Sequence, residues 1–302
     1  MDFIEIAKDI AGSGNVFINE KLEKHTTFRV GGPAACLVTP DSAESVYELV
    51  KICRKENIPY YVIGNGSNLL VSDEGFNGII IKIGRKMSNI SIKDKIITAE
   101  AGVLLSSIGA YAAKRSLTGF EFAAGIPGTF GGACVMNAGA YGGELKDVLV
   151  NVKAITPDGD IKEFAADELK MGYRTSIFLD KDYVILQGEI RLSEGVQSDI
   201  EARMAELAFQ RRDKQPLELP NAGSTFKRPE GHFAGKLIED AGLKGKGIGN
   251  ACVSEKHAGF IVNKGGATAQ NIYDTIRLVI SQVEAQSGIV LEPEIRIIGK
   301  FS

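Results

Sequence analysis

The chain has 302 residues, of which 44% are hydrophobic and 24% are charged, as in an ordinary globular protein. Its formal net charge of -3 gives no reason to expect a nucleic-acid partner or an anionic membrane surface. No apolar run approaches the ~18 residues that a membrane-spanning helix needs. A chain of this length exceeds what one hydrophobic core usually fills, so we expect two or three subdomains.

The N-terminal residues 1–6 are acidic where a secretory signal would be basic, so we expect a cytoplasmic protein. The four cysteines, Cys36, Cys53, Cys134 and Cys252, are far apart and form no Cys-x-x-Cys pair. This spacing favours buried free thiols over a disulfide or a metal site. The three histidines do not pair at helix or strand spacing either, and we expect no metal.

The first half of the chain is predicted to alternate helices with short strands. Asp41 predicts a helix N-terminus, because Glu44 follows three residues later as the reciprocal partner of a capping box. This helix ends at Asn57 and buries one apolar face, consisting of Val46, Leu49, Val50 and Cys53. Compact apolar runs predict strands over 60–63, 78–83 and 95–101, and a longer run predicts a helix over 104–116.

Seven of the nineteen residues over 125–143 are glycines. Each glycine costs backbone entropy on folding, so such a run indicates unusual backbone angles or a close approach of the main chain. Ile126, Phe130, Val135 and Met136 are too apolar for a surface linker, which is the alternative. We therefore favour a cradle of bare main chain for a flat ring system or a pyrophosphate.

The second half is predicted to continue with a hairpin and then a separate unit. Pro157-Asp-Gly159 is a turn signal between two apolar runs. A linker is expected over 211–220, where two prolines follow a helix. The other predicted segments are a strand at 183–192, helices at 198–212, 234–241 and 268–288, strands near 251 and 260, and a final strand at 294–298.

The segment Gly-Asn-Gly-Ser-Asn-Leu-Leu-Val at 64–71 superficially suggests a dinucleotide-binding fingerprint. It lacks the third glycine, since Leu69 stands there, and no crossover helix follows. Its N–H groups and the side chains of Ser67 and Asn68 would still suit a diphosphate, with an ordinary tight turn as the alternative. The segment Thr-Thr-Phe-Arg-Val-Gly-Gly-Pro at 26–33 has the same two interpretations.

Three further residues are candidates for chemistry. Arg174 lies among apolar and hydroxyl residues, where it would clamp an internal carboxylate or bind a substrate anion. Ser224 lies on a glycine turn, as a helix cap or as a proton donor. Glu294 alternates with Ile295 and Ile297 and therefore points away from the face that those residues bury, as a solvated acid or as a functional one.

Taken together, these segments resemble the family of UDP-N-acetylenolpyruvoylglucosamine reductases (MurB), which are flavoenzymes of bacterial wall-precursor synthesis. The matching segments span nearly the whole chain in order, at 25–33, 64–71, 125–145, 173–174, 221–229, 258–263 and 291–296. Only about fifty residues separate Arg174 from Ser224, as in the shorter subtype of the family, which lacks the extra substrate-covering loop.

The resemblance implies an α+β chain with an FAD-binding domain of the vanillyl-alcohol-oxidase (PCMH) type, made of two α+β subdomains, and a C-terminal α+β substrate-binding domain. We expect an N-terminal helical segment over 1–24, the FAD domain over 25–195 and the substrate domain over 196–302. The implied reaction is reduction of the enolpyruvyl ether of UDP-N-acetylglucosamine to UDP-N-acetylmuramate, with NADPH as reductant and non-covalent FAD. We expect a monomer, although the sequence itself does not report the oligomeric state.

The resemblance also implies residue roles. Arg174 would stabilise developing negative charge, Ser224 would donate the proton and Glu294 would assist at the enol carboxyl or a water. The implied FAD contacts are Arg29, Gly31, Gly32, Gly64, Asn65, Gly66, Ser67, Asn68, Gly125, Ile126, Pro127, Gly128, Gly131, Gly132, Asn137, Ala138 and Gly139. The basic residues nearest the predicted domain junction, and so candidates for the diphosphate of the substrate, are Arg211, Arg212, Lys214, Lys227 and Lys236.

Two other functions remain open at this level. Another FAD oxidoreductase of the same fold, such as a hydroxy-acid or alcohol oxidase, would account for the N-terminal two thirds of the chain. It would not account for the Ala-Gly-Ser loop before Thr225 or the Glu-Pro-Glu segment at 292–294. A non-catalytic nucleotide-sensing module is the second alternative, and it would bind no flavin.

Overall fold

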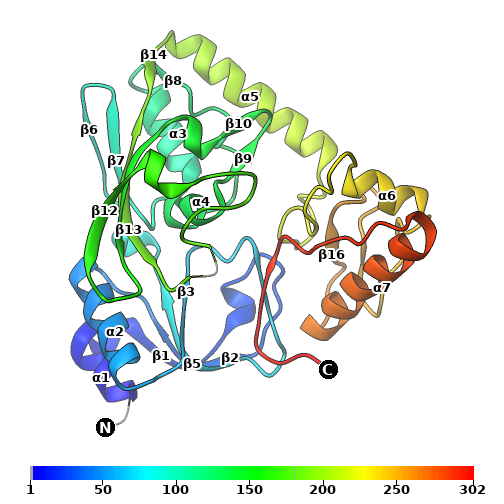
Figure 1. The fold of residues 1–302 in the computed structure, drawn as a ribbon, viewed down its shortest axis with the longest axis horizontal. Coiled ribbons are helices and arrows are strands. Elements are labelled where there is room, and N and C mark those ends of the chain that lie inside the picture. The colour runs from blue at the N-terminus through cyan, green and yellow to red at the C-terminus, as the bar shows by residue number, and fades with distance from the viewer. Residues whose placement is uncertain (1–2, 180) are drawn as a thin grey trace. The chain divides into compact units, whose positions relative to one another are not determined.

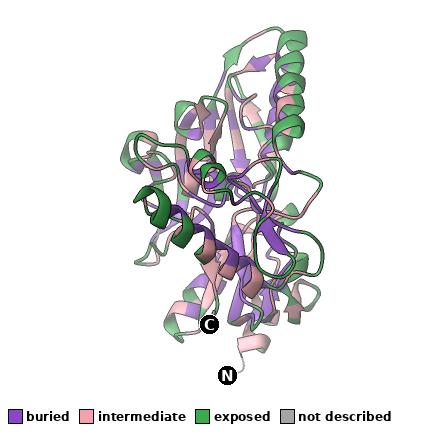
Figure 2. Ribbon diagram, turned by 90° about the vertical axis from the view of Figure 1, so that its right-hand side faces the viewer, coloured by how far each residue is buried: buried purple, intermediate pink, exposed green. Residues whose placement is uncertain are grey.

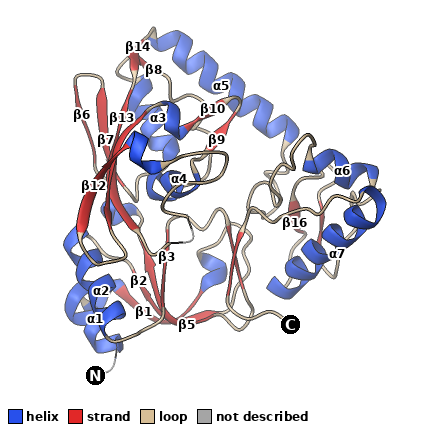
Figure 3. Cartoon of the chain, in the orientation of Figure 1, coloured by secondary structure: helices blue, strands red, loops and turns tan. Residues whose placement is uncertain are grey.

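The computed structural model describes residues 3–179 and 181–302, which mix helices and strands along the whole chain (Figure 3). The predicted N-terminal helical segment 1–24 begins outside the described residues. The helices are α1 (Phe3–Ala11), α2 (Ala43–Lys55), α3 (Leu105–Ala113), α4 (Phe130–Met136), α5 (Gln197–Lys214), α6 (Ala234–Asp240) and α7 (Ala269–Ser287). None of the described helices is both long and apolar enough to cross a membrane.

The strands are mostly short. They are β1 (Val16–Lys21), β2 (Pro33–Val38), β3 (Tyr60–Ile63), β4 (Leu69–Val71), β5 (Phe76–Lys82), β6 (Ile90–Lys93), β7 (Ile96–Glu100), β8 (Leu117–Thr118), β9 (Gly139–Ala140), β10 (Gly143–Glu144), β11 (Leu149–Ile155), β12 (Ile161–Ala165), β13 (Val184–Arg191), β14 (Ser193–Glu194), β15 (Ala251–Val253), β16 (Ile261–Asn263) and β17 (Arg296–Ile298). The larger sheets have the orders β1-β2-β5-β3 and β12-β11-β13-β7-β6, and β17 pairs in parallel with β4.

The described chain forms two compact units. Unit 1 consists of residues up to Phe17, Cys36–Asn65 and Gly78–Arg211, and unit 2 of Ile18–Ala35, Gly66–Asn77 and Arg212–Ser302. Both units are discontinuous in sequence, whereas the predicted domains were continuous ranges. The division falls inside β1, β2 and β5, a feature that local sequence patterns do not report.

The antiparallel five-stranded sheet is the main element of unit 1 (Figure 1). The turn at Pro157-Asp-Gly159 joins β11 to β12 as predicted, with Ile155 paired to Ile161. Helix α4 packs against β13 and β7. Figure 2 shows the buried residues concentrated on the strands, while the outward faces of the helices are exposed.

Helix α2 agrees with its prediction except at its cap. Val46, Leu49, Val50 and Cys53 are all fully buried, as the apolar spacing predicts. The N-cap is Ser42 rather than Asp41, because the Ser42 hydroxyl accepts the hydrogen bond from Ser45 N–H. The prediction of Asp41 was wrong by one residue: both residue types cap helices, and sequence alone did not separate them. The four cysteines are buried free thiols, as predicted.

Unit 2 packs around α7. Thr268 caps this helix by accepting from Asn271 N–H, and Gly288 ends it in the left-handed conformation. Its apolar face buries Ile272, Ile276, Val279 and Val283, while Ile280 is half-buried. Helix α5 begins at Gln197, one residue before the predicted start at Ser198.

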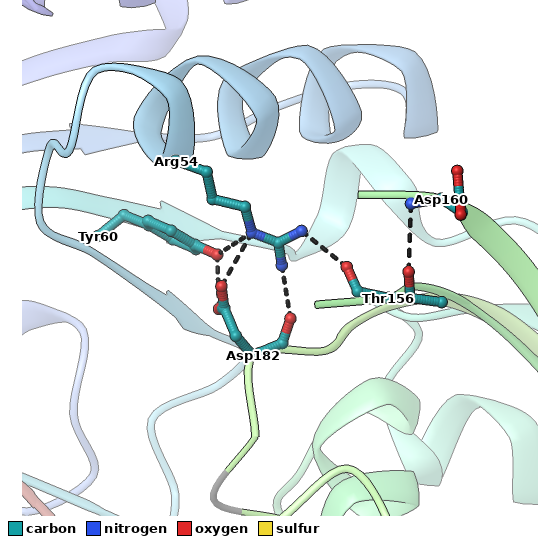
Figure 4. A network of polar contacts seen from close by, with 5 residues as sticks. All are labelled: Arg54, Tyr60, Thr156, Asp160 and Asp182. Atoms are coloured by element: carbon teal, nitrogen blue, oxygen red, sulfur yellow. Dashed lines mark hydrogen bonds and ion pairs between the residues drawn. The ribbon is translucent and has the colours of Figure 1, made fainter. Parts of the chain in front are cut away.

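A polar network in unit 1 holds the segment that leads into β13 (Figure 4). The Arg54 guanidinium at the end of α2 donates to the Asp182 carboxylate at 2.8 Å and to the Thr156 carbonyl at 2.7 Å. The Tyr60 hydroxyl donates to the same carboxylate at 2.5 Å. Burial is the main cause that raises the pKa of Tyr60. Asp182 is thereby fixed to α2, β3 and the turn after β11.

Candidate active site

In unit 1, the loop after β3 meets the glycine-rich segment 125–143. The Asn65 side-chain amide donates to the Pro127 carbonyl at 2.7 Å. A Cβ placed on Gly64 would lie only 2.1 Å from the Thr129 Oγ1. Two segments that were separately predicted to contact a cofactor therefore lie against each other, and Gly64 is required by this approach.

The glycines of this segment do not all have the same role. A Cβ on Gly131 would lie 2.9 Å from Ala101 Cβ, and one on Gly139 would lie 2.6 Å from the Gly143 carbonyl. Close packing inside the unit therefore explains why glycine stands at these two positions. Gly125 and Gly132 are exposed, and a Cβ on either would meet atoms no nearer than 3.5 Å. Gly142 is also exposed, with nothing within 4 Å of its Cβ position, so the open main chain that a flat ligand would need is at these three glycines.

The glycine-rich segment contains a helix that the sequence patterns did not predict. Thr129 stands at the N-cap of α4, a position that threonine favours, and this was the available signal. The N–H groups of Phe130 and Gly131 donate to the carbonyls of Val103 and Ala101, at 2.8 and 2.9 Å. Both N–H groups are therefore hydrogen-bonded within unit 1 and do not donate to a ligand.

Arg174 lies on a tight turn of unit 1. Gly172 and Thr175 exchange backbone hydrogen bonds across it, and Arg174 has a positive φ of 52°. Its guanidinium donates to the Gly139 carbonyl at 3.1 Å. The structure therefore places Arg174 against the end of the glycine-rich segment, on a backbone conformation that costs about 1–2 kcal/mol for a residue other than glycine.

Arg211 is the second cation beside this segment. A Cβ placed on Gly125 would lie 3.5 Å from the Arg211 Cδ. Burial lowers the pKa of its guanidinium, with Tyr141 acting in the opposite direction. Within residues 3–179 and 181–302, no carboxylate pairs with Arg211. A half-buried cation without a carboxylate suits an anionic ligand.

In unit 2, the loop at 26–32 meets the loop at 66–68. Thr27 N–H donates to the Gly66 carbonyl at 3.1 Å, and a Cβ on Gly66 would lie 2.0 Å from the His25 carbonyl oxygen. Arg29 has a positive φ of 55°. The predicted cofactor residues Arg29, Gly31, Gly32, Gly66, Ser67 and Asn68 are thus gathered on two adjoining loops.

Unit 2 also brings together the segments that contain Ser224 and Glu294, two of the predicted catalytic residues. The Thr225 carbonyl, directly after Ser224, accepts a 2.8 Å hydrogen bond from Glu294 N–H, and Phe226 bridges Pro293. The Asn68 amide donates to the Glu294 carbonyl at 3.2 Å. Ser224 is exposed and Glu294 half-buried. The segments of Ser224, Glu294 and Asn68, which are far apart in sequence, therefore adjoin one another.

The predicted basic residues differ in what they already bind. Lys227 pairs with Glu292 at 3.0 Å and Lys236 pairs with Asp240 at 2.5 Å, both at exposed positions. Lys214 is exposed, and the described residues offer it no ion pair. Arg211 and Lys214 stand three residues apart on α5, a spacing that puts two side chains on one helix face.

Sequence reasoning missed the residues that support these candidates. Thr129 contacts Gly64, and Asn137 and Glu144 lie around the turn that carries Arg174. Asn137 was predicted as a cofactor contact on resemblance alone. Among the described residues, no three His, Cys, Asp or Glu side chains gather in a way that could hold a metal ion.

Two family models match separate parts of the chain. The model of an FAD binding domain matches residues 34–165, and the model described as UDP-N-acetylenolpyruvoylglucosamine reductase, C-terminal domain, matches residues 215–298. The chain is 51% identical to the UDP-N-acetylenolpyruvoylglucosamine reductase of Clostridium botulinum, over 93% of this chain and 92% of that protein. It is 46% identical to that of Clostridium perfringens, over 99% and 98%.

Solved structures give the same result. The fold is similar to that of UDP-N-acetylenolpyruvylglucosamine reductase from Thermus caldophilus, with a TM-score of 0.80, 36% identity, and coverage of 93% of this chain and 98% of that one. It is also similar to 4-ethylphenol oxidase from Gulosibacter chungangensis, with a TM-score of 0.51 over 64% of this chain and 42% of that one. At 16% identity, the second likeness concerns the fold alone.

Proposed function

This chain belongs to the UDP-N-acetylenolpyruvoylglucosamine reductase family and is an FAD-dependent oxidoreductase, and we propose that it reduces UDP-N-acetylglucosamine enolpyruvate to UDP-N-acetylmuramate with NADPH as reductant. The predicted fold, an α+β chain with an FAD-binding domain of the vanillyl-alcohol-oxidase type, is confirmed. The product is a peptidoglycan precursor, and the reaction is proposed to run in the cytoplasm on a monomer.

The pairing of the Ser224 and Glu294 segments in unit 2 is the observation that carries this proposal. A simple FAD-dependent oxidase has no need of a hydroxyl on a glycine turn held beside an acidic segment. The main-chain bond from Glu294 to Thr225 fixes the spacing of the two segments, so each side chain starts from a defined backbone position. Preorganised groups of this kind are what proton delivery in one step requires.

The residues present fit FAD. Gly125, Gly132 and Gly142 leave the main chain open to a flat ring, whereas Gly32, Gly64 and Gly66 are closely packed and shape the loops at 26–32 and 64–68. Bound FAD would supply the redox chemistry, a hydride taken from NADPH and delivered to the terminal carbon of the enolpyruvyl double bond. We propose that the FAD contacts come from the residues named for them above, with the exception of the Asn137 side chain.

Arg174 is proposed to meet the negative charge that develops next to the carboxylate of the substrate. A guanidinium does not lose its charge at any ordinary pH. Its turn is closed by the two backbone bonds between Gly172 and Thr175. Removing one preorganised charge-stabilising donor typically costs about 2.7–4 kcal/mol of barrier.

Ser224 is proposed to donate the proton that completes the lactyl ether. Its exposed hydroxyl has no hydrogen-bond partner among the described residues, so it is available to a bound substrate. A serine is a weak acid and becomes an effective donor only to a strongly basic carbon with which it is already aligned. Glu294 is proposed to assist at the enol carboxyl or through a water.

The diphosphate of the substrate is proposed to contact Arg211 and Lys214. Support comes from the half-buried guanidinium of Arg211, which no carboxylate neutralises in the described part of the chain. Lys227 and Lys236, also candidates from the sequence, each have a carboxylate partner already. A weaker contribution is therefore expected from these two lysines.

The half-reactions of Ser224→Ala test the proposal. Flavin reduction by NADPH should stay near the wild-type rate, because no proton donor to carbon acts in that step. Reoxidation by the UDP-enolpyruvyl sugar should slow at least ~100-fold, the low end of the range for general acid catalysis. The two rates would be measured separately by stopped-flow absorbance.

Ser198→Ala, at an exposed position of α5, is the matched control and should change neither rate. Equal slowing of both half-reactions in Ser224→Ala would show that the serine supports the structure of unit 2 and does not donate the proton.

A further inference from the structure

The turn that carries Arg174 needs an external support. Tyr173 and Arg174 are its two central residues, and Arg174 has a φ of 52°. Left-handed backbone in a residue with a Cβ persists only where the surroundings determine it. The hydrogen bonds between Gly172 and Thr175, at 3.1 and 3.3 Å, close the turn but do not fix its place in unit 1.

Asn137 supplies that support from the end of α4. Its Nδ2 donates to the Gly172 carbonyl at 2.9 Å, which is the carbonyl that also accepts from Thr175 N–H. The side chain is fully buried, with 0% exposure. Asn137 itself lies in the left-handed conformation, with φ 44° and ψ 58°, which asparagine tolerates better than most residues.

The remaining capacity of the Asn137 amide is used inside the same unit. Its second donor lies 3.2 Å from the Glu144 carboxylate, and its Oδ1 accepts from Lys146 N–H at 2.9 Å. An amide NH₂ has two donors, and here one bonds to Gly172 and the other to Glu144. A side chain in this state has no donor left for a cofactor, although the resemblance had implied that Asn137 contacts FAD.

Glu144 connects the amide to the guanidinium. The Lys146 ammonium lies 2.6 Å from this carboxylate, and the positive charge of Arg174 acts on it as well. The Arg174 guanidinium also donates to the Gly139 carbonyl, two residues after Asn137. The backbone and the charged end of Arg174 are thus both held by residues of the segment 137–146.

We propose that Asn137 is a positioning residue for Arg174 and that its side chain does not bind FAD. The inference rests on the role proposed above for Arg174 in the enolpyruvyl reduction. Through the Gly172 carbonyl, Asn137 sets where the turn lies, and the Gly139 carbonyl accepts from the guanidinium. A displacement of about 1 Å at a reacting centre can cost on the order of 10²-fold in rate.

Two variants separate this role from simple capping of α4. Asn137→Gly keeps the left-handed backbone and removes the whole side chain. In its ionised form, the Asn137→Asp side chain keeps an acceptor for Lys146 N–H but has no donor for Gly172. If the bond to Gly172 is what matters, the two variants should show the same defect.

The expected defect is selective. Reoxidation of the reduced flavin by the UDP-enolpyruvyl sugar should slow about tenfold or more, while FAD affinity and reduction by NADPH stay within about twofold. In an Arg174→Ala background, Asn137→Gly should change the reoxidation rate by less than about twofold, because the residue acts through the arginine. The proposal would be overturned if the two reductions in reoxidation rate multiplied in the double variant, or if Asn137→Gly lost FAD.

Amide hydrogen exchange gives a readout that does not depend on turnover. The peptide over 172–176 should exchange faster in both variants, as the turn loosens, while the peptides of α7 are unchanged. Unchanged exchange at 172–176 would also overturn the proposal. If wild-type reduced flavin is not reoxidised by the sugar, the proposed function fails, yet the exchange result still decides whether Asn137 holds the turn.

Asp182→Asn is the matched control. It weakens the network with Arg54 and Tyr60 in the stretch between the Arg174 turn and β13. This variant should lower the melting temperature. A loss of reoxidation rate in Asp182→Asn as large as that in Asn137→Gly would mean that any loosening of the segment suffices, which would contradict a specific role for Asn137.

Discussion

His257 couples the protonation of one side chain to the stability of unit 2. Its Nδ1 accepts a 3.1 Å hydrogen bond from Gly259 N–H, and its ring packs edge-on against Phe260. Burial is the main cause that lowers its pKa, with Lys244 adding to the effect and Glu239 opposing it. The folded chain therefore holds this ring neutral where an unfolded chain would begin to protonate it.

The sign of the pH effect follows from this shift. Because the folded-state pKa lies below the unfolded value of ~6.5, the unfolded chain binds more protons between the two values. The stabilisation is complete above ~6.5 and is lost as the pH falls toward the folded pKa. Urea unfolding across that window should show a falling free energy of unfolding in the wild type.

His257→Asn should flatten this dependence, because an asparagine Oδ1 can accept from Gly259 N–H without titrating. The variant will be less stable overall, since it loses the ring contact with Phe260. His232→Asn, at an exposed position, should keep the wild-type slope. An unchanged slope in His257→Asn would assign the acid sensitivity to other groups.

At the level of single residues, the sequence identified the types of candidate residue better than their surroundings. Arg174 was selectable from its apolar and hydroxyl neighbours, Ser224 from a glycine turn and Glu294 from an alternating pattern. The meeting of Ser224 with Glu294 depends on backbone pairing between positions seventy residues apart, and no local pattern encodes that register. The contacts of Asn137 were invisible for the same reason, because Gly172 is brought to it by tertiary packing.

At the level of elements, periodic helices and bounded strands were predictable, and elements inside unusual composition were not. Helix α7 has caps at both ends and one apolar face, so its limits follow from the sequence to within a residue. Helix α4 was missed because two glycines in its first turn oppose helix formation. Tertiary packing overrides that preference, since Phe130 and Cys134 are fully buried.

Gly64→Ala tests the close approach between the β3 loop and the glycine-rich segment. The new Cβ would lie 2.1 Å from Thr129 Oγ1 and 3.2 Å from Thr129 Cβ. We expect a loss of about 1–3 kcal/mol in the free energy of unfolding, as for other overpacked sites, together with weaker FAD binding. Urea unfolding and flavin fluorescence titration would measure the two effects.

Gly14→Ala is the control, because a Cβ there would meet nothing within 4 Å. Adding Thr129→Ala to Gly64→Ala should restore part of the lost stability, since it removes the nearest clashing atom. If Gly64→Ala is as stable as Gly14→Ala, the two segments do not need their close approach.

At the level of the whole molecule, the family and the fold class were predictable and the division of the chain was not. Motifs dispersed over almost the full length identify the family, and relatives at 45–51% identity confirm it. The compact units draw on three chain ranges each, because strands early in the sequence contribute to both. The linker predicted over 211–220 marks only one of these boundaries, and the predicted domain limit at 195/196 marks none of them.

The visible spectrum of the purified protein tests the central claim most directly. We expect the absorbance of an oxidised flavin, lost when NADPH is added without oxygen and recovered when the UDP-enolpyruvyl sugar follows. A protein that binds no flavin even with added FAD, or a reduced flavin that oxygen reoxidises and the sugar does not, would contradict the proposed reduction.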